Sequence, residues 1–236
     1  MTAPCGVANC PVLETPPVGL RTHRIEGGAR FHRGYKRNHA SASLVPGRGD
    51  TRFAPLDGTA HVYLATTALA ALLESALHST AGAAPLVYVA ELAIWAASKV
   101  TLVEATRFID LRDDELERLG IDRRQVVATS PTHYPCTRNL AAQLQGRVIG
   151  GQQTHGLLWN SRQAELVAAA LDHRPALRDM VDEHPSEVAV LWSPPVGPTP
   201  LAQTDLDLTE SLGPLLDGPG RAYIDDLTAL LGIAQV

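Results

Sequence analysis

A single carboxylate interrupts one of the most apolar helical stretches of the chain. Residues 61–78 read HVYLATTALAALLESALH, and Glu74 is the one Asp, Glu, Lys or Arg in this stretch. On an α-helix both sides of Glu74 would be mainly Ala and Leu, which predicts a buried helix. An ionised carboxylate is costly to bury unless it meets a cation or several hydrogen-bond donors. We therefore expect Glu74 to have a partner, either an arginine in a structural ion pair or a ligand held beside the small Ala70 and Ala71.

Arginines are the natural counterparts of this carboxylate. Residues 21–52 hold eight of the twenty Lys and Arg residues but only two acids, Glu26 and Asp50, in a chain whose net charge is −5. A guanidinium binds phosphate oxygens as well as carboxylates through paired hydrogen bonds, so Arg33 and Arg52 would suit a pyrophosphate. One cationic segment in an acidic chain favours a small anionic ligand and not nucleic acid, whose binders usually spread basic charge over a face. A solvated basic loop is the alternative.

Tyr63 and Ser161 are further candidates at the ends of predicted strands. Tyr63 lies eleven residues after Arg52 and eleven before Glu74. Its ring would stack on a planar or cationic ligand, or it is an interior tyrosine. Ser161 follows a buried strand and precedes a predicted helix, where a serine is most often an N-cap. No Gly-x-Ser-x-Gly elbow surrounds it, and no Rossmann or P-loop glycine pattern occurs in the chain.

The three cysteines predict neither disulfides nor a metal site. Cys5, Cys10 and Cys136 are an odd number and form no disulfide framework. Cys5 and Cys10 are separated by four residues, and we identify no second Cys or His pair at comparable spacing, so no metal is expected. A hydrolase that uses Cys136 with His133 or His155 is disfavoured, because that cysteine lacks an electropositive surrounding.

The elements that would position these residues alternate between strands and helices. Strands are expected at 30–35, 61–65, 101–111, 125–129, 155–160 and 187–192, and in the first half of 86–95. Helices are expected at 68–78, 113–120, 134–146 and 161–173. Many short strands interleaved with helices favour an α+β fold with a mixed sheet over a doubly wound sheet.

The chain divides into three predicted segments. Residues 1–20 read as a flexible Pro-rich tail, residues 21–192 as the domain that carries the chemistry, and residues 193–236 as a Pro-rich linker followed by an acidic C-terminal helix. No apolar stretch is long enough to span a bilayer, and the N-terminus lacks the pattern of a secretory signal, so a cytoplasmic protein without membrane contact is expected.

Six short motifs, in their order and spacing, resemble the RES domain family. They are HR (32–33), RFAP (52–55), VYLA (62–65), ALLES (71–75), YPCTRNLA (134–141) and GLLWNSRQ (156–163). The family is named for an Arg, a Glu and a Ser, which the resemblance assigns to Arg33 or Arg52, Glu74 and Ser161. It implies a fold like that of the ADP-ribosyltransferases.

The resemblance also implies an activity. Members of the family are toxins of bacterial toxin–antitoxin pairs that cleave the nicotinamide–ribose bond of NAD, by phosphorolysis, hydrolysis or ADP-ribosyl transfer. NAD would be a substrate and no cofactor would be needed. Inorganic phosphate or a protein would be the acceptor, and an antitoxin with a helix-turn-helix domain would be the partner. A catalytically silent nucleotide- or protein-binding module of the same fold is the alternative.

The resemblance further implies a role for each candidate residue. Glu74 would stabilise the ribosyl centre or hold the ribose hydroxyls. The other roles are pyrophosphate or phosphate binding for Arg33 and Arg52, packing on the nicotinamide or its ribose for Tyr63, binding of ribose or nicotinamide for Ser161, and secondary binding roles for His32 and Tyr35.

Overall fold

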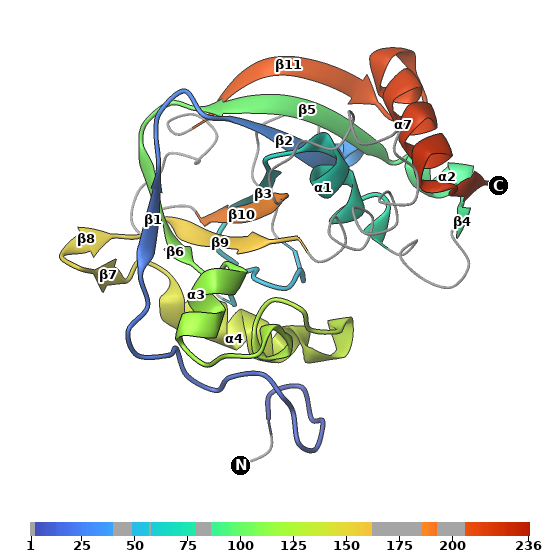
Figure 1. Ribbon diagram of the computed structural model, residues 1–236. Helices are drawn as coiled ribbons and strands as arrows, with labels where there is room; N and C mark the ends of the chain where they lie inside the picture. The colour runs from blue at the N-terminus through green and yellow to red at the C-terminus, as the bar shows by residue number, and fades with distance from the viewer. Residues whose placement is uncertain (1–2, 40–48, 57, 79–85, 162–185, 193–205) are drawn as a thin grey trace.

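A mixed sheet forms the centre of the protein (Figure 1). The computed structural model describes residues 3–39, 49–56, 58–78, 86–161, 186–192 and 206–236. Within them the sheet has eight strands in the order β1-β6-β9-β10-β3-β2-β5-β11. Strands β6 and β9 run parallel, and the other neighbours run antiparallel. The expected α+β fold with a mixed sheet is confirmed.

The strands of the main sheet are β1 (Thr22–Ile25), β2 (Arg30–Lys36), β3 (His61–Ala65), β5 (Trp95–Leu102), β6 (Thr106–Asp110), β9 (Gly156–Asn160), β10 (Glu187–Trp192) and β11 (Leu206–Pro214). Two small ladders pair β4 (Leu86–Val87) with β12 (Ala234–Gln235), and β7 (Val148–Ile149) with β8 (Gln152–Gln153).

The α-helices are α1 (Ala68–Leu73), α2 (Val89–Leu92), α3 (Asp113–Arg118), α4 (Tyr134–Leu144) and α7 (Gly218–Leu231). Three 3-10 turns are η1 (Arg37–His39), η3 (Arg123–Gln125) and η4 (Pro131–His133). None of the helices in the described part of the chain has the length and apolar character needed to cross a bilayer.

Apolar side chains cover both faces of the sheet. In β10, Val188 and Val190 belong to the larger cluster, and Ala189 and Leu191 belong to the smaller cluster. This division follows from the alternation of side chains along a strand. A strand buried on both faces reads as a continuous apolar run, which is why EVAVLW was recognisable in the sequence.

Several predicted elements differ from the structure. The strand expected at 101–111 is two strands, β5 and β6. The stretch 86–95 begins with the short strand β4, continues with α2 and ends at the first residue of β5, so only part of its first half is a strand. The strand expected at 125–129 is absent, because a capping box between Asp122 and Gln125 turns the chain and lets Val126 and Val127 enter the core from a turn. Helix α1 ends at Leu73, earlier than expected. The predicted helix at 161–173 and linker at 193–200 extend over residues outside those described.

The C-terminal segment, predicted as a separate linker and acidic helix, shares the sheet and the core with the rest of the chain. Strand β11 pairs with β5 along its whole length and completes that edge of the sheet. Helix α7 adds Ile224 and Leu227 to the larger core cluster. The acidic composition concealed this strand, because Leu206 and Leu212 are its only buried side chains.

The N-terminal segment also packs against the domain, in contrast to the flexible tail that was predicted. Residues 3–20 run beneath α3 and α4 (Figure 1). The backbone nitrogen of Leu13 donates to the carbonyl of Gln125 at 3.1 Å. Val12 and Leu20 are buried. Apolar residues spaced among the prolines therefore anchor this segment.

Candidate active site

A cleft of about 530 Å³ opens where β2 and β3 separate. The two strands share one registered pair, His32 with Ala65. Strand β2 nevertheless continues to Lys36 and pairs with β5 over its whole length. Residues 33–36 of β2 and 61–63 of β3, which lie beyond the shared pair, line the cleft. The cleft is therefore a gap in the sheet.

Arg33 is carried into this cleft by β2. The residue is 5 % exposed, and its Cζ atom lies 5.2 Å from the centroid of the Tyr35 ring. Burial lowers the pKa of Arg33 to about 10, and the charge interaction with Tyr35 opposes that change. The guanidinium still carries its charge at neutral pH. In surroundings with little water it would attract an anion more strongly than an exposed arginine does.

Arg52 enters the cleft from the loop at 49–56. Its Nη2 donates to the carbonyl of Thr129 at 3.3 Å, and its Cζ lies 5.6 Å from the centroid of the Tyr134 ring. Its backbone carbonyl accepts a hydrogen bond from Thr137 Oγ1 at 2.7 Å, so α4 holds the loop in place. The Nε atom of Arg52 is buried and has no hydrogen-bond partner among the described residues.

Glu74 and Ser161 meet at this cleft. Glu74 is the C-cap of α1 and lines the cleft. Ser161 follows β9 and is fully buried, and its Oγ donates to Glu74 Oε1 at 2.7 Å. In the described part of the chain no arginine forms an ion pair with Glu74. The carboxylate has a partner, as expected, but that partner is a serine. Ser161 itself does not line the cleft.

The ends of α1 and β9 are joined through Ser186, just before β10. Thr67 caps α1 by accepting from the Ala70 nitrogen at 3.1 Å, and its Oγ1 lies 3.2 Å from Ser186 Oγ. The Ser161 nitrogen donates to the Ser186 carbonyl at 2.8 Å. The same residue therefore positions the helix that carries Glu74 and the strand that ends at Ser161.

Helix α1 also packs closely on β2 at Gly34. A Cβ atom at this position would lie 3.1 Å from Ser75 Cβ and 3.3 Å from the Ala71 carbonyl oxygen, and closer still to Ser75 Oγ. Only glycine permits this approach without displacement of the helix. The approach brings Glu74 to the cleft that Arg33 also lines.

Tyr63 lines the cleft mainly with its ring. Its hydroxyl accepts a hydrogen bond from the Phe53 nitrogen at 3.0 Å. Burial raises the pKa of Tyr63 to about 12, so the phenol stays protonated. The ring lies edge-on to Trp159, with 6.0 Å between centroids, and to His61, with 5.7 Å. These contacts fix the orientation of the ring at the cleft.

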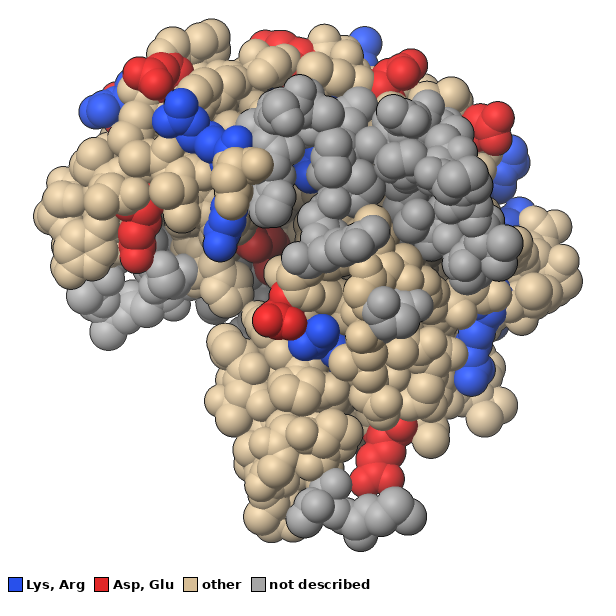
Figure 2. All heavy atoms as spheres, turned by 180° about the vertical axis from the view of Figure 1, so that it is seen from behind, with Lys and Arg blue, Asp and Glu red and all other residues tan. Residues whose placement is uncertain are grey.

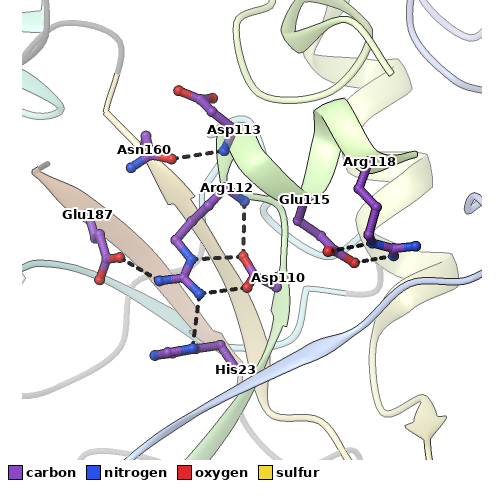
Figure 3. A network of polar contacts seen from close by, with 8 residues as sticks. All are labelled: His23, Asp110, Arg112, Asp113, Glu115, Arg118, Asn160 and Glu187. Atoms are coloured by element: carbon purple, nitrogen blue, oxygen red, sulfur yellow. Dashed lines mark hydrogen bonds and ion pairs between the residues drawn. The ribbon is translucent and has the colours of Figure 1, made fainter. Parts of the chain in front are cut away.

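A polar network holds the beginning of β10 (Figure 3). Arg112 donates through Nε and Nη2 to the two oxygens of Asp110, at 2.9 and 2.7 Å, and through Nη1 to Glu187 Oε1 at 2.9 Å. A further contact of 2.9 Å joins Arg112 Nη2 to His23 Nδ1. Burial alone would raise the pKa of Asp110, but the hydrogen bonds and charge of Arg112 outweigh it and lower that pKa.

The same network reaches the end of β9. The Asn160 side chain accepts from the Asp113 nitrogen at 2.9 Å, and the Asn160 carbonyl accepts from Arg123 Nη2 at 3.0 Å. Figure 3 shows Asn160 beside the start of α3. Because Asn160 precedes Ser161, these bonds restrict where the serine hydroxyl lies.

The structure brings together most of the residues predicted for the site. Arg33, Arg52, Glu74, Tyr63 and Tyr35 all line the cleft, and Ser161 contacts it through Glu74. His32 does not line it. That residue forms the one pair between β2 and β3, where the sheet is still closed.

Several residues of the cleft were not predicted from the sequence. His61, His78, Tyr134 and Trp159 line it as well. Burial lowers the pKa of both histidines; for His78 the charge of Glu74 opposes this change. The position of His78 four residues after Glu74 was the one available signal. The aromatic residues stand in apolar stretches and could not be distinguished from core residues.

Charge on the surface is mixed. On the face shown in Figure 2, Lys and Arg side chains are scattered among Asp and Glu side chains and do not gather into one patch. Residues 21–52 therefore contribute single arginines, such as Arg33 and Arg52, to the cleft. They form no broad basic surface on this face.

Comparisons with known proteins identify the fold and the family. One chain of the crystal structure of the M. tuberculosis MbcT–MbcA toxin–antitoxin complex is similar in fold, with a TM-score of 0.51 and 16 % sequence identity over 87 % of this chain and 92 % of that chain. No curated protein sequence matches. The sequence model of the RES domain matches residues 21–193, a range that includes both arginines, the glutamate and the serine of the cleft. This protein therefore belongs to the RES domain family.

Proposed function

We propose that this protein is the toxin of a toxin–antitoxin pair and that its cleft cleaves the nicotinamide–ribose bond of NAD. The observation that carries the proposal is the hydrogen bond from Ser161 to Glu74 at a cleft that also contains Arg33 and Arg52. Membership of the RES domain family supports it, as does the similarity in fold to a chain of a toxin–antitoxin complex.

The two arginines suit the pyrophosphate of NAD. Both guanidinium groups lie against tyrosine rings, which restricts their orientation before a ligand arrives. The buried Nε of Arg52 is a donor without a partner among the described residues. A buried donor in that state costs about 1–3 kcal/mol, which a phosphate oxygen would recover.

Glu74 suits the reacting centre. When the bond between nicotinamide and ribose breaks, the nitrogen keeps the bonding electrons and positive charge develops on the ribose. A carboxylate fixed beside that carbon stabilises the charge as it forms. Water, phosphate or a protein side chain then bonds to the same carbon, which gives hydrolysis, phosphorolysis or ADP-ribosyl transfer.

Ser161 supports this role through its hydrogen bond to the carboxylate. Its hydroxyl donates a hydrogen bond to Oε1 of Glu74, which leaves Oε2 available to accept a hydrogen bond from the ribose. The burial of Ser161 and its absence from the cleft lining favour a positioning role over direct contact with ribose or nicotinamide.

Aromatic rings suit the nicotinamide end of the substrate. Tyr63, Trp95, Tyr134 and Trp159 line the cleft together with Tyr35. The nicotinamide ring of NAD carries a positive charge, and such a ring is attracted to aromatic faces. An antitoxin with a helix-turn-helix domain would neutralise the enzyme by covering this cleft.

The test is nicotinamide release from NAD by the purified protein, with and without inorganic phosphate. Chromatography of the second product distinguishes ADP-ribose from a phosphorylated ADP-ribose, and mass spectrometry detects modified protein. Glu74→Gln keeps the shape and removes the charge, so we expect turnover to fall by about 10²- to 10³-fold. Glu91→Gln, at an exposed residue of α2, is the matched control and keeps full activity.

A well-folded protein that binds NAD but releases no nicotinamide would refute the enzymatic proposal. That result would favour the silent binding module. Normal turnover by Glu74→Gln would instead show that the carboxylate is structural.

A further inference from the structure

Three cysteines and a histidine from distant parts of the sequence converge outside the cleft lining. The Sγ atoms of Cys5, Cys10 and Cys136 lie within 4.8 Å of one another. The Nδ1 atom of His133 lies 3.5 Å from Cys5 Sγ and 3.3 Å from Cys10 Sγ, and 3.6 Å separates the Sγ atoms of Cys10 and Cys136. These are all the cysteines of the chain.

The three thiols lie close enough to share one metal ion, and the Nδ1 atom of His133 lies beside two of them. Zinc bonds of about 2.3 Å to sulfur and 2.0–2.1 Å to nitrogen, in tetrahedral geometry, place two sulfurs about 3.8 Å apart and a sulfur and a nitrogen about 3.6 Å apart. The contacts of 3.3–3.6 Å in the cluster are close to these edges. A disulfide needs about 2.05 Å between sulfurs, so at 3.6 Å the two thiols are not bonded.

The backbone around Cys5 and Cys10 is arranged for sulfur ligands. Gly6, directly after Cys5, and Asn9, directly before Cys10, adopt left-handed conformations with φ of 69° and 56°. The turn they shape brings the Cys5 and Cys10 thiols together beside Cys136.

We propose that Cys5, Cys10, Cys136 and His133 bind one Zn²⁺ ion in a structural site that fastens the N-terminal segment to the start of α4. Three thiolates and an imidazole form a closed set of four ligands and leave no open position for catalysis. The site follows from two short pairs, Cys5-x4-Cys10 and His133-x2-Cys136. No metal was expected from the sequence because His133 and Cys136 were considered only as a catalytic pair.

The zinc would connect the N-terminal segment to the cleft. His133 ends η4, and the next residue, Tyr134, lines the cleft and lies against Arg52. A metal bond at His133 therefore limits the movement of the ring that supports Arg52. An effect of the zinc on activity rests on the proposed function, whereas zinc binding itself needs no substrate.

The test is the metal content of the full-length protein purified in the presence of a thiol reductant. We expect one zinc per chain by plasma mass spectrometry, with release after mercurial titration of the thiols. Cys10→Ser and His133→Asn are expected to lower zinc content at least tenfold. His155→Asn changes an exposed histidine outside the cluster and is expected to retain one zinc per chain.

Cobalt substitution keeps the proposal testable where a variant fails to fold. Wild-type protein stripped of metal and titrated with Co²⁺ is expected to show intense visible bands of tetrahedral cobalt and a thiolate-to-cobalt charge-transfer band, saturating at one equivalent. A chain that contains no zinc and gives no such spectrum would overturn the site, and so would peptide mapping that finds a Cys10–Cys136 disulfide under reducing purification. Loss of NAD turnover with full zinc content would count against the proposed function alone.

Discussion

Replacement of Ser161 by Ala is the sharpest test of how the site is assembled. Ser161 Oγ donates to Glu74 Oε1 at 2.7 Å from a fully buried position. A hydrogen bond to a charged group contributes about 1.5–3 kcal/mol. If the bond serves to hold the carboxylate for the transition state, this range corresponds to a fall in kcat of about 10- to 150-fold. KM for NAD should change little, because Ser161 does not line the cleft.

A double-mutant cycle with Glu74→Gln separates positioning from direct contact. A residue that acts only through Glu74 loses its effect once the charge is gone. In the Glu74→Gln background we therefore expect Ser161→Ala to change kcat/KM by less than about threefold. The assay is initial-rate nicotinamide release, with circular dichroism and thermal unfolding of each variant to confirm folding.

Thr154→Ala is the matched control for this cycle. Thr154 is also buried, and its Oγ1 donates to the Arg147 carbonyl at 2.9 Å, away from the cleft lining. The control should lose a similar amount of stability and keep its turnover. The positioning role is refuted if Ser161→Ala lowers kcat/KM by the same factor with and without the Glu74 charge. It is also refuted if the substitution raises KM while kcat stays normal. Either result would place Ser161 against the substrate.

Three further predictions concern the supports of the site. Gly34→Ala should destabilise the protein by about 1–3 kcal/mol in chemical denaturation, because the new Cβ meets Ser75, and Ser75→Ala should relieve part of the loss. The lowered pKa of Asp110 stabilises the fold fully above its unfolded value of about 3.9, and this contribution is lost as the pH falls through the folded value. Denaturation followed against pH should show that dependence in the wild type and lack it in Arg112→Met, which should also lose about 3 kcal/mol at pH 7. Arg52→Lys should weaken NAD binding about tenfold in calorimetry on the inactive Glu74→Gln protein, since lysine lacks the Nε donor; unchanged affinity would exclude Arg52 from the pyrophosphate site.

The central part of the fold could be predicted because its strands are buried on both faces. Strands β3, β9 and β10 read as uninterrupted apolar runs, and the structure has them at or within one residue of the expected bounds. Strand β11 could not be found in the same way. It lies at the edge of the sheet, most of its side chains are exposed, and its pairing with β5 is a long-range contact that local composition does not encode.

Within the candidate site, Glu74 was predictable because it is a charged residue in a stretch that is expected to be buried. The carboxylate of Glu74 in an apolar stretch required a partner, and the structure has one, although it is Ser161 and not an arginine. Trp159 and Tyr134 were not predictable, because an aromatic residue that faces a cleft has the same sequence surroundings as one that faces the core. The cluster of Cys10 and Cys136 was hidden by sequence distance, since the fold alone brings together residues 126 positions apart.

The place of β10 in the sheet has a consequence for synthesis. It is inserted between β9 and β3 and so joins the strand group β1, β6 and β9 to the group β3, β2 and β5. Glu74 belongs to one group and Ser161 to the other, 87 positions later in the chain. A nascent polypeptide has no means of aligning the two groups until residues 186–192 have left the ribosome, and such long-range pairing is slow. The proposed activity therefore requires a chain that includes β10, and fragments that end before β10 cannot assemble the site.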